Sequence, residues 1–194
     1  MATPSANAAY PVHFDVLYPE GGNRFMILIR WLLALPHYIV LYFLQLIASI
    51  LVFVAWFILL ITGRYPSGMF SFVEGYLRWS MNVSAYVYFH NQYPPFSMNE
   101  GDYDPLMFSV TEQDSYSRLS VLFRVFLLIP HIIVLYFLQL AAAVVGLAMV
   151  LVVLVTGNYP RGMFNFLVGV GRWTARLNAY AFLLTDKFPP FSMT

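Results

Sequence analysis

The segment PHYIVLYFLQL at Pro36–Leu46 recurs almost unchanged as PHIIVLYFLQL at Pro130–Leu140. The same offset relates other positions along the chain: Phe14 and Phe108, Arg24 and Arg118, Gly63 and Gly157, Tyr65 and Tyr159, and Trp79 and Trp173. Near the repeat ends one residue is inserted, so YPPFSM at Tyr93–Met98 matches FPPFSM at Phe188–Met193. The chain therefore holds two copies of one module. We divide it into a first repeat, 1–98, an acidic linker, 99–106, and a second repeat, 107–194.

The composition is typical of a membrane protein. Apolar residues make up 60% of the chain and charged residues 10%, whereas a soluble domain carries about 45–50% apolar and about 25% charged residues. The net charge of +1 is too small for a nucleic-acid-binding protein, so we expect no nucleic-acid partner. The chain has no cysteine, which excludes disulfides and thiolate metal ligands.

Each repeat contains one long apolar run, Phe25–Ile61 in the first and Leu119–Val155 in the second. Both runs far exceed the roughly 20 residues that span a bilayer. Proline disfavours helix at the preceding residue, so Pro36 and Pro130 are expected to break the runs. We therefore predict a short amphipathic helix in each repeat, Asn23–Leu35 in the first, followed by a spanning helix.

Residues at the ends of these runs fit helix caps. Asn23 and Ser117 precede the runs and are good N-caps. Gly63 and Gly157 follow the runs, where a C-cap glycine is expected. These signals predict where the spanning helices begin and end.

A second helix is predicted at about 68–91 and again at about 162–185, each with a narrow polar stripe on an otherwise apolar surface. Such a stripe suggests a helix in the bilayer with its polar edge turned inward. We therefore expect an all-α membrane protein with an internally duplicated helical module and four membrane-embedded helices, two per repeat. If the second helices lie flat instead, two spans remain and the repeats are inverted.

Short interfacial helices and extended segments complete this expected fold. Tyr10–Tyr18 alternates like a strand, and the aligned piece Met107–Thr111 offers it a partner for a small sheet. Arg64 and Arg161 lie in the tight loops, which the positive-inside rule would place in the cytoplasm. Arginines at the opposite helix ends weaken that assignment.

Four motifs carry a resemblance to a known family: WLLALPHYIV at Trp31–Val40, TGRYPSG at Thr62–Gly68, LRW at Leu77–Trp79 and YPPF at Tyr93–Phe96. Together they resemble an integral-membrane family catalogued as domain-of-unknown-function family 4389, over about Tyr10 to Met193. The second copy departs at Asn158, where the motif has Arg, and at Leu128-Ile129. The resemblance implies a protein of a prokaryotic cytoplasmic (inner) membrane, often in tandem copies. It supplies no activity and no catalytic residue.

His37 and His131 occupy equivalent positions directly after the two prolines. Two symmetric imidazoles are candidate ligands of haem or of a chlorophyll magnesium. The alternative, which we favour, is that each histidine makes a structural hydrogen bond, so that no cofactor is bound. His13 and His90 have no histidine counterparts in the other copy, and no metal site is expected.

Charged residues on the second helices form another candidate site. Glu74 and Arg78 are an i,i+4 pair in the favourable order, and we expect a structural ion pair. The repeat symmetry predicts that Arg172 or Arg176 lies near Glu74. The functional alternative is a lipid- or anion-binding site, whose candidate residues are Arg78, Arg172, Arg176, Arg24 and Arg118. Arg30 and Arg124 are likewise expected at the interface, where arginines snorkel.

No catalytic motif is present, so we expect no enzyme activity. We predict a non-catalytic accessory or scaffold subunit of the membrane. Its partners would be membrane lipids and either other integral membrane proteins or further copies of itself. The alternative is a lipid- or cofactor-binding membrane protein that uses His37 and His131 or the arginine stripe. A small transporter or channel ranks third, since intramembrane polar groups are few.

Overall fold

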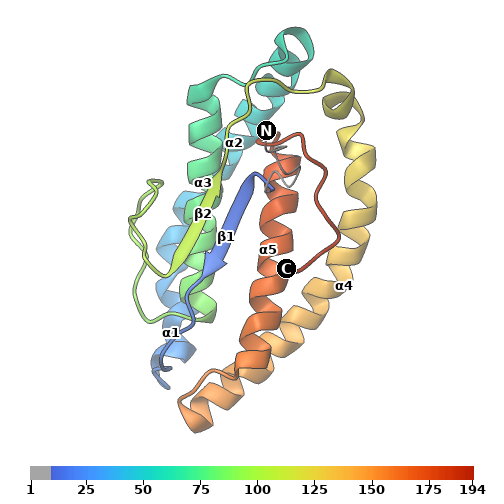
Figure 1. Cartoon of the computed structure of the whole chain (residues 1–194). Coiled ribbons are helices and arrows are strands. Elements are labelled where there is room, and N and C mark those ends of the chain that lie inside the picture. The colour runs from blue at the N-terminus through green and yellow to red at the C-terminus, as the bar shows by residue number, and fades with distance from the viewer. Residues whose placement is uncertain (1–9) are drawn as a thin grey trace, which may run out of the picture.

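The computed structural model describes residues 10–194, so the first nine residues of the first repeat lie outside it. The elements follow the chain in the order β1 (Val12–Val16), α1 (Met26–Leu33), α2 (Leu35–Thr62), α3 (Ser67–Tyr88), β2 (Leu106–Val110), α4 (Arg118–Thr156) and α5 (Arg161–Ala181) (Figure 1). The fold is mostly helical. Two stretches, Met26–Thr62 and Arg118–Thr156, are long and apolar enough to cross a membrane.

The two prolines interrupt their helices less than the sequence predicts. Before Pro36 a single residue, Ala34, separates α1 from α2, and its backbone stays in the right-handed helical region. Pro130 lies inside the continuous helix α4, so the predicted break there is wrong. A proline removes one backbone hydrogen bond from a helix. In each repeat a buried arginine and a buried histidine flank the proline, and this packing holds the helix in line across the missing bond.

The predicted caps are present at the helix ends. The Asn23 side-chain oxygen accepts a hydrogen bond from the Met26 N–H at 3.1 Å, and the Ser117 hydroxyl caps α4. Gly63 and Gly157 end α2 and α4 with φ of 69° and 74°. Glycine adopts this left-handed conformation without steric cost, so both spanning helices stop where the sequence predicts.

The two extended segments pair as an antiparallel two-stranded sheet, β1 with β2. The register places Phe14 opposite Phe108, with Val12 opposite Val110 and Val16 opposite Leu106. Phe14 and Phe108 are equivalent residues of the two repeats. A pseudo-twofold axis therefore passes between them, and the sheet joins the repeats at this axis.

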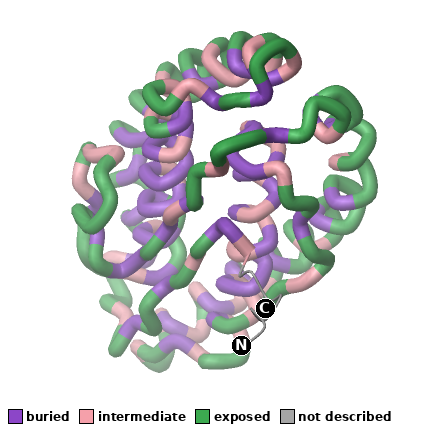
Figure 2. Tube along the Cα trace, turned by 45° about the horizontal axis from the view of Figure 1, so that its top comes forward, coloured by how far each residue is buried: buried purple, intermediate pink, exposed green. Residues whose placement is uncertain are grey.

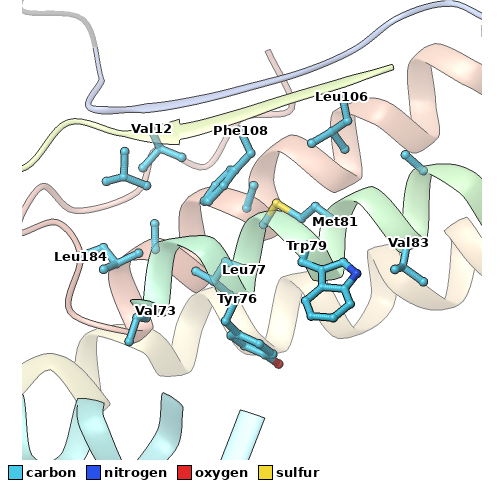
Figure 3. Packing of buried hydrophobic residues seen from close by; sticks show 14 of the residues in the cluster. Val12, Val73, Tyr76, Leu77, Trp79, Met81, Val83, Leu106, Phe108 and Leu184 are labelled. Atoms are coloured by element: carbon cyan, nitrogen blue, oxygen red, sulfur yellow. The ribbon is translucent and has the colours of Figure 1, made fainter. Parts of the chain in front are cut away.

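Each strand packs on a helix of the other repeat. Arg172 on α5 donates a hydrogen bond from Nε to the Phe14 carbonyl of β1 at 3.3 Å. Arg78 on α3 donates in the same way to the Phe108 carbonyl of β2 at 2.9 Å. Figure 3 shows Leu106 and Phe108 of β2 pointing toward Leu77 and Met81 of α3. The repeats are thus interlocked by exchanged strands.

The repeats are inverted relative to one another. The Tyr116 N–H, just before α4, donates to the Gly63 carbonyl at the end of α2, at 2.9 Å. The Gly22 N–H, before α1, donates to the Gly157 carbonyl at the end of α4, also at 2.9 Å. The spanning helices are therefore antiparallel, and the tight loops after them lie at opposite ends of the molecule. This corrects the expectation that both loops share one side.

Burial divides the molecule into layers. Helix α3 is buried along most of its length, and α5 along much of it, and the strands cover both (Figures 1 and 2). Helix α2, in contrast, is buried only along a stripe that contains Leu41, Ala48 and Ala55, and α4 repeats this pattern. The core therefore lies around α3 and α5, while α2 and α4 expose apolar side chains over most of their circumference.

Candidate functional site

Each repeat holds a fully buried histidine among aromatic side chains. His37 Nδ1 accepts a hydrogen bond from the indole N–H of Trp79 at 3.1 Å. The ring of Phe96 stacks on the imidazole with centroids 3.9 Å apart. His131 repeats this arrangement with the equivalent residues of the second repeat, at the same 3.1 and 3.9 Å. Two nearly identical clusters therefore join the spanning helices to α3 and α5.

The hydrogen bond from tryptophan decides which imidazole nitrogen carries the proton. Because Nδ1 accepts, the neutral ring is protonated on Nε2. Within residues 10–194, Nε2 of His37 and of His131 is buried without a hydrogen-bond partner. An axial ligand of haem or chlorophyll needs a free lone pair, which neither nitrogen offers, and a stacked phenylalanine covers the ring. These histidines do not fit such a cofactor; the geometry suits a packing role.

Glu74 and Arg78 form a close ion pair on α3, 2.8 Å between Glu74 Oε1 and Arg78 Nη2. Arg78 also donates to the Phe108 carbonyl and to the Met98 carbonyl, at 2.9 and 2.8 Å. Glu74 accepts the N–H of Val110 at 2.9 Å. All three nitrogens of Arg78 are thus engaged inside the chain. This arrangement ties β2 and the first Pro-Pro segment to α3 and does not favour a lipid phosphate at Arg78.

Arg172 and Arg176 do not join this ion pair in the described structure. Arg172 lies 3.4 Å from Asp15 and donates to the Met193 carbonyl at 3.1 Å. The guanidinium of Arg176 lies over the Tyr10 ring, 5.6 Å from its centroid. The sequence expectation that one of them approaches Glu74 is therefore not met, because the inverted repeats place Arg172 against β1 and Arg176 beside Tyr10.

The arginines at the helix starts fall into two groups. Arg24 and Arg118 are exposed, which suits contact with lipid headgroups. Arg30 is fully buried and Arg124 nearly so, so the expectation that these two snorkel at an interface is wrong. The sequence signal that separates them is position, since Arg30 lies just over one turn after the start of α1 and Arg124 lies more than one and a half turns after the start of α4.

The two buried arginines differ in their partners. Arg124 pairs with Asp186, 2.6 Å from Nη2 to Oδ1, and donates to the Tyr180 carbonyl at 2.8 Å. Arg30 instead donates to the Tyr159 hydroxyl at 2.9 Å and to the side-chain oxygen of Asn91. Asn91 is the counterpart of Asp186 in the repeat alignment. In the part of the chain that the structure describes, Arg30 thus lacks a carboxylate partner.

His90 lies beside this uncompensated charge, in the segment that follows α3. Burial lowers the pKa of His90, a hydrogen bond with the Leu17 backbone raises it, and the charge of Arg30 lowers it further. Its Nε2 is buried without a partner among residues 10–194. Within the same range, no cluster of three or more histidine, aspartate or glutamate side chains is placed to hold a metal ion.

Comparison with known proteins identifies the family. No curated protein and no solved structure matches the chain. A family model described as a domain of unknown function (DUF4389) matches residues 24–99 and 118–193. Both matches contain the spanning helix, the following core helix and the Pro-Pro-Phe segment. Neither match contains the strand that precedes the spanning helix in the repeat. The chain therefore belongs to the DUF4389 family, with two tandem copies of its domain.

Proposed function

We propose that this chain is a non-catalytic membrane scaffold subunit whose helices α2 and α4 cross the bilayer and whose strand face packs against a partner protein. The observation that carries the proposal is the exposed apolar surface of the two long helices. From Trp31 to Gly63 and from Val125 to Gly157 the chain holds no acidic residue, lysine or arginine. Hydrocarbon is the medium in which such a surface is stable.

Large side chains populate this surface all along both helices. Ile50, Phe53 and Ile61 on α2 are 63%, 64% and 74% exposed. Val144 and Val155 on α4 have comparable exposure. A soluble monomer rarely exposes contiguous apolar patches beyond a few hundred Å². The surface of α2 and α4 therefore favours a lipid environment.

The opposite face of the molecule requires a different environment. His13 and Asp15 of β1 are exposed there, next to the acidic linker. The strands lie alongside α3 and α5, which pack on α2 and α4. If α2 and α4 cross the bilayer, the strands therefore lie at the depth of the bilayer. Lipid cannot satisfy open strand edges or such polar side chains, whereas a partner protein can. This requirement supports a subunit that is completed by another membrane protein.

The inverted repeats distribute the remaining arginines evenly. Arg24 and Arg161 lie at one end of the helix pair, and Arg64 and Arg118 lie at the other, because the end of each spanning helix meets the start of the other. If α2 and α4 cross the membrane, each headgroup layer receives two of these arginines. With equal numbers of these arginines at the two ends, the positive-inside rule assigns no orientation. The position of the exposed Arg24 and Arg118 in the headgroup layers also supports lipid phosphates as their contacts.

Cysteine labelling tests the span directly, since the chain has no cysteine of its own. We expect Arg64→Cys and Arg161→Cys to react with a membrane-impermeant maleimide from opposite sides of sealed vesicles. Ile50→Cys, in the middle of α2, should stay unlabelled until detergent is added. Labelling of both loops from the same side would overturn the two-span arrangement, and extraction of the chain by alkaline carbonate would overturn membrane insertion.

Gentle detergent extraction tests the scaffold role. We expect the chain to migrate in a native gel with a defined partner or as a defined assembly of copies. Met107→Lys changes the exposed face of β2 and should release the chain from this partner or assembly. Glu112→Lys is an exposed change outside the strands and should leave the complex intact. Migration of the intact chain only as a small monomer would reject the proposed role.

A further inference from the structure

A cavity of about 310 Å³ lies between the repeats. Its lining comes from the strands and from α3, α4 and α5, and includes Phe14, Ala85, Ala143, Gly171, Thr174 and Ala175. This volume is about twice that of an engineered apolar cavity of ~150 Å³ that binds benzene. The cavity is therefore large enough for part of an organic ligand.

Two small residues of the second repeat line this cavity at positions where the first repeat has large residues. Gly171 and Ala175 of α5 line the cavity, and their counterparts on α3 are Leu77 and Met81. Leu77 is 2% exposed and packs in the core. The same fold thus carries large side chains at these positions in one copy and small ones in the other. This difference makes the cavity asymmetric, although Met81 of α3 also lines it and Phe14 packs against Gly171.

The lining offers little to a polar ligand. No charged residue is among the described lining residues. The hydroxyls of Ser80, Ser84 and Thr174 donate to carbonyls of their own helices, at 2.8, 2.9 and 2.8 Å. The Gln139 amide donates to the Thr174 hydroxyl at 3.0 Å. The Asn178 amide also lines the cavity and makes no side-chain hydrogen bond within residues 10–194. Apart from this amide, the surface that a ligand meets is mainly apolar.

The exposed lining residues are Ser84 and Tyr88 of α3 and Gln139 and Ala143 of α4, so we place the opening between these two helices. Ala143 lines the cavity and is exposed on α4, beside the exposed Val144. A ligand that enters past Ala143 comes from the surroundings of α4. If those surroundings are hydrocarbon, the abundant molecule that matches an uncharged, apolar cavity is a lipid with its alkyl chain.

We infer that the cavity between the repeats binds one alkyl chain of a membrane lipid, with the chain passing Ala143 and ending between α3 and α5. The entry route rests on the proposed membrane function, whereas the cavity itself does not. Either an acyl chain of a phospholipid or a free fatty acid has the required chemistry. The site is separate from the histidine clusters and from the arginine contacts described above.

Photolabelling of the detergent-purified full chain tests this inference. The probes are palmitic acid with a diazirine near its methyl end, and phosphatidylcholine that carries the same acyl chain. We expect crosslinks to peptides of α3 and α5 that lie in the cavity, competed by an excess of the unlabelled lipid. Labelling by phosphatidylcholine identifies a phospholipid chain, and labelling by palmitic acid alone identifies a free fatty acid.

Two variants close the cavity in different ways. Ala175→Met places the residue of the first repeat inside it, and Ala143→Phe blocks the opening from an exposed position. Both should abolish the crosslinks in α3 and α5. Ala141→Phe is the matched control, because Ala141 is exposed on the same helix but does not line the cavity, and its labelling should match the wild type.

The outcomes separate this inference from the proposed function. Unchanged crosslinks in well-folded Ala143→Phe, or labelling confined to the outer surface of α2 and α4, overturn the cavity site. Ala143→Phe decides the question even if Ala175→Met does not fold. Specific labelling of a chain that carbonate nevertheless extracts from membranes would support the cavity and reject the two-span membrane function.

Discussion

Arg30 and Arg124 are the most deeply placed charges of the described structure, and the chain compensates only one of them with a carboxylate. A buried charge is costly to desolvate, and the cost is offset only by close partners. Arg124 has Asp186 at 2.6 Å, whereas Arg30 has the neutral Asn91. The first repeat therefore carries an unfavourable electrostatic contribution that the second repeat avoids.

The single changes Asn91→Asp and Asp186→Asn should have opposite effects on the free energy of unfolding. We expect Asn91→Asp to raise the free energy of unfolding, because it supplies the missing carboxylate to Arg30. Asp186→Asn should lower it by about 2 kcal/mol, since Arg124 loses its charged partner. Denaturation in matched detergent measures both. A destabilised Asn91→Asp chain would show that Arg30 is already compensated.

Because His90 is half-buried beside Arg30, we expect the free energy of unfolding to depend on pH. Its pKa in the folded chain lies below the ordinary 6.5, because burial and Arg30 disfavour the imidazolium. As the pH falls below 6.5, the unfolded chain takes up the proton first, so the free energy of unfolding decreases. Above pH 6.5 this contribution is constant. We expect His90→Gln to make the stability profile shallower between pH 6.5 and 5, and an unchanged slope would contradict this assignment.

Helices α3 and α5 each carry a glycine where a Pro-Pro-Phe segment approaches the helix closely. A Cβ at Gly75 would lie 2.8 Å from Met98 Cβ, and one at Gly169 would lie 3.0 Å from Met193 Cβ. These glycines let the Pro-Pro-Phe segments lie directly on the core helices. The arginine one turn further, Arg78 or Arg172, then binds the carbonyl of the same methionine.

Alanine substitutions distinguish this packing role from helix propensity. Gly75→Ala and Gly169→Ala should each lower the free energy of unfolding by about 1–3 kcal/mol, because the segment must shift. Gly68→Ala is the control, since a Cβ there meets nothing within 4 Å, and it should be neutral or stabilise by up to about 1 kcal/mol. Equal effects at Gly75 and Gly68 would show that the close contact contributes nothing.

The exchanged strands make the two repeats mutually dependent. β1 covers α5 and β2 covers α3, each held by an arginine of the opposite repeat. The core around α3 is therefore incomplete without residues of the second repeat, and the core around α5 is incomplete without the first. We therefore expect the whole chain to fold as one unit although its sequence has two copies.

Division of the chain in the linker tests this dependence. Gly101 is exposed, and a break there leaves each strand on its own fragment. We expect co-expressed fragments 1–101 and 102–194 to co-purify as one complex, because the strands cross between them. Each fragment expressed alone should aggregate or be degraded. A stable, monomeric first fragment with a cooperative unfolding transition would contradict the interlocked fold.

The amino-acid pattern alone predicts the duplication, the long apolar helices, their caps at Ser117, Gly63 and Gly157, the two extended segments and the Glu74–Arg78 pair. These features depend on nearby residues: apolar runs, cap residues and i,i+4 spacing act over one or two helical turns. The break at Pro130 failed as a local prediction because burial of the flanking side chains outweighs one lost hydrogen bond.

Tertiary packing decides which copy each segment contacts. Since the repeats present nearly the same residues, β1 meets equivalent chemistry on α3 and on α5, and local patterns cannot choose between them. The antiparallel pairing of β1 with β2, in register at Phe14 and Phe108, settles which helix each strand covers. In this arrangement the repeats are inverted, and Arg172 contacts β1 and does not approach Glu74. The cavity has the same origin, because the effect of a small residue such as Ala175 depends on what packs opposite it across the two repeats.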